Sequence, residues 1–270
     1  DEEFFKKVKK AAHNFRDVES NSIAETTLLA RKDQLHIAVD LTGYTQKGRS
    51  EIFHHRVAPV QINYLGYPGT MATDCIDYVI ADKTLIPVEK EGFYKEKIIF
   101  MPDCYQPTND NLTISNSGLT KEDLGLPPDA FVFCAINQGY KIKAQEFDIW
   151  MRLLRHVNGS VLWLKNQNKW MVSNLQAEAK IRGIDPKRLI FTKHVPHDKY
   201  IAQFTQADLY LDTFIYNAGT TASDVLMAGL PLVTKIGDGY SSRMAASLLN
   251  ACNMNELVTE TPKDYESLAL

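Results

Sequence analysis

The chain has 270 residues, of which 44% are hydrophobic and 23% are charged, and its formal net charge is −3. This length is enough to bury one large core or two smaller ones, so we expect a globular protein with two lobes. The acidic balance, with no Lys/Arg run longer than two residues, excludes the strongly basic surface with which proteins bind nucleic acid or anionic membranes.

The cysteine and hydropathy patterns predict a protein of the reducing cytoplasm. Cys75, Cys104, Cys134 and Cys252 form no CxxC pair, which favours buried thiols over disulfides or a zinc site. No signal peptide is visible at the start of the chain, and no apolar run reaches the ~18 residues of a membrane span. We therefore expect no metal site and no membrane anchor.

Short apolar runs of strand length alternate with helical patterns along the chain. Strands are predicted at 36–41, 59–65, 78–81, 97–101, 131–136, 160–164, 188–192, 208–213 and 231–234. Helices between the later strands are predicted at 144–156, 170–182, 197–207, 220–229 and 241–250. Continuous apolar strands separated by helices favour parallel sheets that are covered on both faces. The predicted fold class is therefore α/β and doubly wound.

A polar stretch between residues 102 and 128 shows little periodicity and is the predicted linker between two lobes. We expect a partial N-terminal lobe at 1–110, with a helix and about four strands. We expect a more complete Rossmann-like lobe at 111–270, with five strands and alternating helices.

Ligands of open parallel sheets collect beyond the carboxyl ends of the strands. In the first lobe, "NYLGYPGT" (63–70) follows a strand, and its glycines and proline either form a tight structural turn or let the backbone approach a ligand. In the second lobe, "NQGYKI" follows the strand at 131–136. Its Lys141 is either a solvated loop lysine or a cation that faces a bound anion, and Gln138 and Tyr140 either bind the ligand or shape the turn.

The segment "YNAGTTASDVLMAGLP" (216–231) predicts an anion site at the start of a helix. Gly219, Thr220 and Thr221 precede an apolar helical run, with Asp224 one turn into it. The free N–H groups and the dipole of a helix N-terminus attract negative charge, and small hydroxyl residues add donors there without crowding a ligand. Lys141 is expected beside this helix start.

Several motifs of other nucleotide and hydrolytic sites are absent. The sequence contains neither GxxxxGK[ST] nor GxGxxG, and it lacks HExxH and GxSxG. It also lacks Asp-x-Asp, a common means of binding a metal-diphosphate. A diphosphate bound here would therefore be neutralised by lysine and backbone N–H groups rather than by magnesium.

Seven segments, taken in order, resemble the catalytic region of the nucleocytoplasmic protein O-linked N-acetylglucosaminyltransferases, with the bacterial homologues closest. They are "HIAVDLTGYT", "APVQINYLGYPGT", "DYVIADKTLIP", "MPDCYQP", "FVFCAINQGYKI", "GSVLWL" and "AGTTASDVLMAGLPLVT". The similarity runs from about residue 4 to residue 270, the C-terminal part of that region. In the family, superhelical tetratricopeptide repeats and the first half of the N-terminal lobe precede this part.

The resemblance implies a GT-B type fold, with two Rossmann-like lobes and the N-terminal lobe incomplete here. It implies an inverting, metal-independent transfer of GlcNAc from UDP-GlcNAc to Ser or Thr of an acceptor protein, with no cofactor. It also implies roles for residues at matching positions: Lys141 at the diphosphate and leaving group, Gln138 at a phosphate, Thr220 and Thr221 at the helix start, Asp224 at the ribose hydroxyls, and Leu65, Gly66 and Pro68 at the sugar and acceptor side.

The sequence departs from the family in two places, and these keep alternatives open. Gly219 stands where the acetylglucosaminyl enzymes usually have a histidine, as in the spindly-type O-fucosyltransferases that use GDP-fucose. In the nucleobase region, Tyr200 and Gln203 replace the usual histidine and arginine, and His197 stands where the animal enzymes have a lysine. The alternatives are a GDP-fucose-dependent enzyme, a non-catalytic nucleotide-binding scaffold, and a nucleotide-sugar epimerase of the same architecture.

Overall fold

The computed structural model describes residues 2–109, 114, 118–193, 195 and 199–270. The chain forms two compact units, Asp1–Ile80 with Gly92–Ile99, and Ala81–Glu91 with Phe100–Leu270. This division falls earlier in the chain than the predicted boundary between residues 110 and 111. Residues 100–109 pack with the second unit rather than with the first.

The first unit is built on a sheet whose described strands have the order β1-β2-β3-β4. The pairs β1–β2 and β2–β3 are parallel. Ala38, Val57 and Ala58 form a small core with residues of the neighbouring helices. The elements are α1 (Glu2–Ala11), α2 (Ile23–Lys32), β1 (Ile37–Asp40), α3 (Glu51–His54), β2 (Val60–Asn63), β3 (Tyr78–Ala81) and β4 (Lys97–Phe100), so each predicted strand of this part is present.

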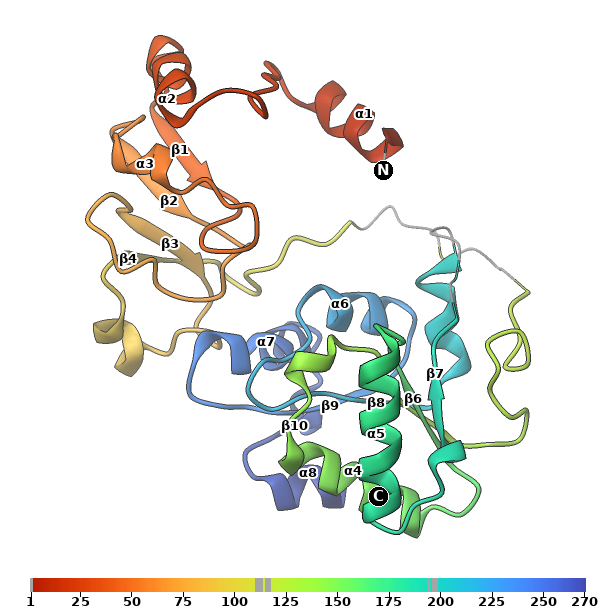
Figure 1. Ribbon diagram of the computed structural model, residues 1–270. Helices are drawn as coiled ribbons and strands as arrows, with labels where there is room; N and C mark the ends of the chain where they lie inside the picture. Colours follow the sequence, from red (N-terminus) through yellow and green to blue (C-terminus); the bar gives the residue numbers. More distant parts are fainter. Residues whose placement is uncertain (1, 110–113, 115–117, 194, 196–198) are drawn as a thin grey trace. The chain divides into compact units, whose positions relative to one another are not determined.

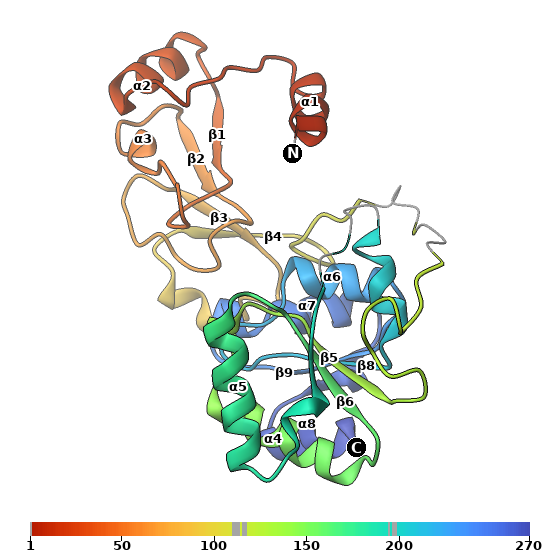
Figure 2. The ribbon, with the colours of Figure 1, turned by 45° about the vertical axis from the view of Figure 1, so that its right-hand side comes forward.

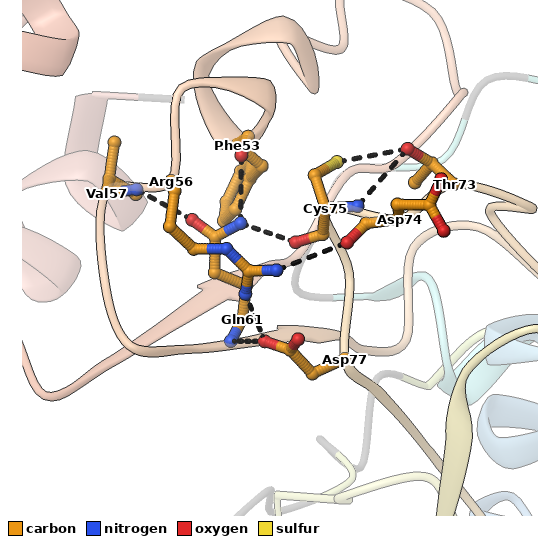
Figure 3. Close-up of polar contacts among 8 residues, drawn as sticks. All are labelled: Phe53, Arg56, Val57, Gln61, Thr73, Asp74, Cys75 and Asp77. Carbon is orange, nitrogen blue, oxygen red and sulfur yellow. Dashed lines mark hydrogen bonds and ion pairs between the residues drawn. The ribbon is translucent and has the colours of Figure 1, made fainter.

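The buried side chain of Gln61 fixes β2 to two loops of the first unit (Figure 3). Its Oε1 accepts a hydrogen bond from the Val57 amide at 2.8 Å, and its Nε2 donates to the carbonyls of Phe53 and Cys75. The backbone N–H of Gln61 donates to the carboxylate of Asp77, which also forms an ion pair with Arg56. Because both the oxygen and the nitrogen of this side-chain amide are hydrogen-bonded, Gln61 joins the segments before and after β2 to the strand.

The second unit contains a larger sheet with the strand order β10-β9-β8-β5-β6-β7, in which all five pairs are parallel. Its chain order alternates strands with helices. The elements are β5 (Val132–Ala135), α4 (Ala144–His156), β6 (Val161–Leu164), α5 (Lys169–Ile181), β7 (Leu189–Phe191), β8 (Leu209–Leu211), α6 (Thr220–Met227), β9 (Leu232–Lys235), α7 (Met244–Ala251), β10 (Val258–Thr259) and α8 (Pro262–Ala269).

Helices cover both faces of this second sheet. Val132 and Cys134 of β5 face a core that includes residues of α6 and α7, whereas Phe133 and Ala135 face a core that includes residues of α4, α5 and α8. Figures 1 and 2 show α6 and α7 on one side of the sheet and α4 and α8 on the other. Successive side chains of a strand point to opposite faces, so the unbroken apolar strands predicted this two-sided burial correctly.

Two parts of the second unit differ from the expected elements. The helix predicted at 197–207 includes residues outside the described part, and its described end is a 3₁₀ turn at Ala202–Gln206. Phe204 and Ala207 donate there to carbonyls three residues earlier, the pattern of a 3₁₀ helix and not of an α-helix, and β8 begins two residues after Ala207. The short edge strand β10 and the final helix α8 complete the unit beyond the five predicted strands.

The start of the predicted linker is packed rather than extended in solvent. Tyr105 is buried, and its amide donates to Asp82 at 2.8 Å. The same carboxylate accepts from Ser247 of α7 and from the amides of Thr84 and Leu85. A buried carboxylate with four donors holds both chain segments against α7.

Within the described residues, no helix has the length and hydropathy to cross a bilayer.

Candidate functional site

A cavity of about 600 Å³ opens at the carboxyl edge of the second sheet. Its lining comes from the segments that follow β5, β6 and β7, from the 3₁₀ turn before β8, and from the loop and first turn of α6. The lining residues are Ile136, Asn137, Gln138, Tyr140, Lys141, Lys165, Asn166, Thr192, Lys193, Val195, Tyr200, Gln203, Tyr216 and Thr221.

Five of the residues predicted from the sequence line this cavity: Gln138, Tyr140, Lys141, Gln203 and Thr221. Gly219, Thr220 and Asp224 adjoin it at the start of α6 without lining it. Leu65, Gly66 and Pro68 belong to the first unit, whereas all residues of the cavity belong to the second. His197 lies outside the described residues.

Lys141 lies against the loop that leads into α6. Only 8% of the residue is exposed, and its Nζ donates to the carbonyl of Asn217 at 2.9 Å. The ammonium also lies 4.0 Å from the centre of the Tyr216 ring, a cation–π contact. An ammonium has three N–H donors, so this lysine can bind a ligand while it keeps its contact with Asn217.

Burial, with a smaller contribution from the ammonium of Lys165, lowers the pKa of Lys141 to about 8, although the carboxylate of Asp212 opposes this shift. Desolvation disfavours the charged form of an amine, and a neighbouring carboxylate favours it. At neutral pH the cavity therefore contains a charged lysine that an incoming anion would stabilise.

The first turn of α6 presents backbone donors. Gly219 occupies the N-cap and offers no side-chain cap, and its carbonyl accepts from Ala222 and Ser223. The amides of Thr220 and Thr221 have no backbone acceptor among the described residues. These are the orphan N–H groups that make a helix N-terminus an anion site. A Cβ added at Gly219 would meet Met244 and Tyr105 at 3.6 Å, an ordinary contact distance.

Asp212, fully buried at the end of β8, determines the shape of the loop before α6. One carboxylate oxygen accepts from the amides of Thr213 and Ala218, both at 2.8 Å. The other oxygen accepts from the hydroxyl of Thr234 on β9 at 2.7 Å. Burial raises the pKa of Asp212 to about 7, although these hydrogen bonds and the charge of Lys141 oppose the shift. The sequence reasoning missed this residue.

Further buried hydrogen bonds join the same loop to the segment after β5. Asn137 donates to the hydroxyl of Thr213, which donates to the carbonyl of Tyr216 at 2.6 Å. Asn217 donates through Nδ2 to the carbonyl of Thr213. Because the Asn217 carbonyl is the acceptor of Lys141, this network fixes the position of the ammonium relative to the first turn of α6.

The far end of the cavity combines apolar and polar groups. Gln203 is 2% exposed, and its Nε2 donates to the Tyr200 carbonyl, while its Oε1 has no partner among the described residues. Burial and the charge of Asp224 raise the pKa of Tyr200 to about 12, and its hydroxyl shares a hydrogen bond with Thr221. Burial also raises the pKa of Asp224. The Oε1 of Gln203 is therefore a buried acceptor at this end of the cavity, unpaired within the described part of the chain.

The turn of the first unit requires glycine for a structural reason. A Cβ at Gly66 would lie 2.1 Å from the carbonyl oxygen of Leu41, so only glycine allows this approach of two loops. Leu65 has a positive φ of 71°, a conformation that non-glycine residues rarely adopt. Both observations support the reading of a tight structural turn, while a ligand role for Leu65, Gly66 and Pro68 stays a prediction.

Lys165, Asn166, Thr192, Lys193 and Tyr216 line the cavity but were not among the residues predicted from the sequence. The rule that found Lys141 could have found the first four, since they directly follow β6 and β7. Among the described residues, no cluster of three or more His, Cys, Asp or Glu could hold a metal ion.

The sequence profile of glycosyl transferase family 41 matches residues 1–111 and 108–270. The chain belongs to this family. Its relatives include the probable UDP-N-acetylglucosamine–peptide N-acetylglucosaminyltransferase SEC of Arabidopsis thaliana, which is 31% identical over 274 residues. That match covers 99% of the chain and 28% of the plant protein. The similarly named SPINDLY protein of Oryza sativa is 28% identical over 99% of the chain and 29% of its own length.

The family 41 chain also matches a solved structure over almost its whole length. An O-GlcNAc transferase variant from Thermobaculum terrenum aligns with a TM-score of 0.88 and 27% identity, over 98% of the chain and 50% of that protein. These matches confirm the predicted family and the α/β fold of GT-B type with Rossmann-like sheets. The chain spans less than a third of the length of the plant relatives.

Proposed function

We propose that this chain is the donor-binding part of an inverting protein O-glycosyltransferase that moves GlcNAc from UDP-GlcNAc to Ser or Thr of acceptor proteins. One observation carries the proposal. Lys141 is held by Asn217 two residues before the N-cap of α6, in a cavity at the carboxyl edge of a parallel sheet. The names of the plant relatives and of the bacterial structure support the choice of donor.

The chemistry of sugar transfer explains why these groups would be needed. When the bond between the anomeric carbon and the β-phosphate oxygen breaks, negative charge grows on the diphosphate and positive charge grows on the sugar. Preorganised donors that meet this growing charge lower the barrier selectively. Lys141 and the amides of Thr220 and Thr221 would supply them without a metal ion. The acceptor hydroxyl would attack the opposite face of the anomeric carbon, and we assign no general base.

Other residues predicted from the sequence would contact the nucleotide. The free Oε1 of Gln203 can accept a hydrogen bond from an N–H group of the base, and Asp224 can accept from ribose hydroxyls. Gln138 and Tyr140 lie beside Lys141 on the loop after β5 and would contact the phosphates. Free thiols at all four cysteines support our further proposal that the protein works in the reducing cytoplasm.

Calorimetric titration of the full chain with UDP, GDP, UDP-GlcNAc and GDP-fucose in the presence of EDTA tests this proposal. We expect the uridine ligands to bind at least tenfold more tightly than the guanosine ligands, a difference of about 1.4 kcal/mol. EDTA should have no effect if the diphosphate is neutralised by protein groups. Preference for GDP-fucose would instead assign an O-fucosyltransferase, and binding of none of the four would favour a scaffold.

The pH profile of the enzyme should report the protonation of Lys141. Because the pKa of this lysine is lowered to about 8, kcat/KM for the donor is expected to fall above about pH 8, roughly tenfold per pH unit. The loss follows from the sign of the charge, since a neutral amine cannot offset the charge of a phosphate. Initial rates at saturating acceptor between about pH 6 and pH 10 would measure it. A profile that stays flat above pH 9 would contradict the assignment.

A further inference from the structure

The cavity contains more positive charge than one lysine provides. Lys141, Lys165 and Lys193 all line it, and no aspartate or glutamate is among its described lining residues. Lysine side chains facing one cavity repel each other unless an anion lies between them. The lining therefore favours a ligand with more than one negative charge.

The three lysines differ in their partners. Lys193 donates to the carbonyl of Asp123 at 3.2 Å, and Lys141 donates to Asn217. Lys165 is half-buried and directly follows β6, and no hydrogen bond or ion pair joins its ammonium to another described residue. Its donors are therefore available to a ligand in the cavity.

The position of Lys165 is fixed by the sheet. Strand β6 pairs with β5 on one side and β7 on the other. Lys165, which directly follows β6, therefore lies at the carboxyl edge of the sheet next to the segment after β5 that contains Lys141. The two ammonium groups are close enough that Lys165 lowers the pKa of Lys141. An anion bound between the two ammonium groups would attract both of them and offset their mutual repulsion.

We propose that Lys165 is a second phosphate-binding residue, which holds the diphosphate of the nucleotide sugar together with Lys141. This inference rests on the proposed function and extends it to a residue that was not among those predicted from the sequence. Two ammonium groups together with the helix start would neutralise more of the diphosphate charge than one ammonium group and the helix start. The second lysine would also keep the leaving nucleoside diphosphate bound as the sugar departs.

The test compares Lys165→Gln and Lys165→Arg with Lys169→Gln in the full chain. Lys169 is a matched control because it is an exposed lysine four residues later, at the start of α5; its ammonium lies 4.8 Å from the Trp170 ring, and it does not line the cavity. The probes are UDP, uridine and inorganic pyrophosphate, titrated by calorimetry. The pH dependence of UDP binding is measured for each variant.

We expect Lys165→Gln to weaken UDP and pyrophosphate about tenfold or more, as the loss of a charge-assisted hydrogen bond would, and to leave uridine unchanged. The alkaline limit of UDP binding should move to higher pH, since a charge that lowers the pKa of Lys141 is removed. Lys165→Arg should restore most of the affinity, and Lys169→Gln should behave as the parent.

Each other outcome has a definite reading. Equal UDP affinity and an unmoved alkaline limit in Lys165→Gln would overturn the inference, while binding of UDP and UDP-GlcNAc by the parent chain would leave the proposed function standing. Pyrophosphate binding that depends on Lys165 in a parent chain that binds none of the four nucleotides would support the anion site and overturn the proposed function.

Discussion

Replacement of Lys141 with alanine is expected to reduce sugar transfer by ~10²–10³ or more, about 3–4 kcal/mol of transition-state stabilisation. Among the described lining residues, Lys141 is the one buried cation, and it lies against the loop that begins α6. Its charge would be most valuable when the diphosphate becomes the leaving group. The loss should therefore appear mainly in kcat, and the affinity for UDP should fall less.

The fold should tolerate this substitution. The ammonium loses solvation on burial, and its removal deletes one hydrogen bond to Asn217, so the free energy of unfolding should change by only about 1 kcal/mol. Urea unfolding checks this, and Lys169→Ala serves as the control that removes a lysine outside the cavity. Unchanged turnover by a folded Lys141→Ala variant would remove the catalytic role from this residue.

Replacement of Asp212 with alanine should cause the largest loss of stability, about 3–5 kcal/mol. The side chain is fully buried, and its removal leaves the amides of Thr213 and Ala218 and the hydroxyl of Thr234 without their acceptor. It also leaves Lys141 without its nearest opposing charge. Because the loop before α6 depends on these bonds, transfer should be lost together with stability.

The Asp212→Asn variant separates the shape of the loop from its charge. An amide oxygen can still accept from both backbone amides, so unfolding should resemble the parent more closely than Asp212→Ala. Without the carboxylate, the pKa of Lys141 should fall further, and the alkaline limb of kcat/KM should move to lower pH. Thr234→Val, which removes one hydrogen bond to this carboxylate worth about 1.5–3 kcal/mol, is the matched control and should leave the limb in place.

The pH dependence of unfolding gives an independent measurement. Asp212 is an acid whose pKa is raised on folding from 3.8 to about 7, so its protonation favours the folded state. That contribution is complete below about pH 4 and is lost as the pH rises toward 7. Urea unfolding at several pH values should show this slope in the parent, and Asp212→Asn should lack it. The same slope in the variant would show that another group causes it.

The fold was readable from local pattern to an unusual extent. Strands such as 131–136 and 160–164 are continuously apolar, and a parallel sheet buried on both faces is the arrangement that accepts such strands. The weakest predictions concerned short elements. The five residues Ala202–Gln206 form a 3₁₀ turn where an α-helix was predicted. Strand β10 has only two residues, too few to show a period.

The candidate site was readable only where a familiar pattern marks it. Lys141, Thr220 and Thr221 follow strand ends in segments that resemble a known family. Lys165 follows a strand in the same way, yet nothing in its own segment distinguishes it from a solvated lysine. Asp212 directly follows β8, and its sequence context is that of an ordinary boundary between a strand and a loop.

The sequence by itself determined the α/β class, the family, and the residue types that could bind a diphosphate. Periodicity and motif order are properties of local segments, so they can be read before the chain folds. The tertiary structure alone decided which of these groups share one cavity. Lys141 donates to the carbonyl of Asn217, 76 positions later in the chain. The carboxylate of Asp212, which follows β8, accepts from the hydroxyl of Thr234 on β9. Those relations depend on the strand order β9-β8-β5-β6, which places distant residues side by side and sets the burial that shifts their pKa values.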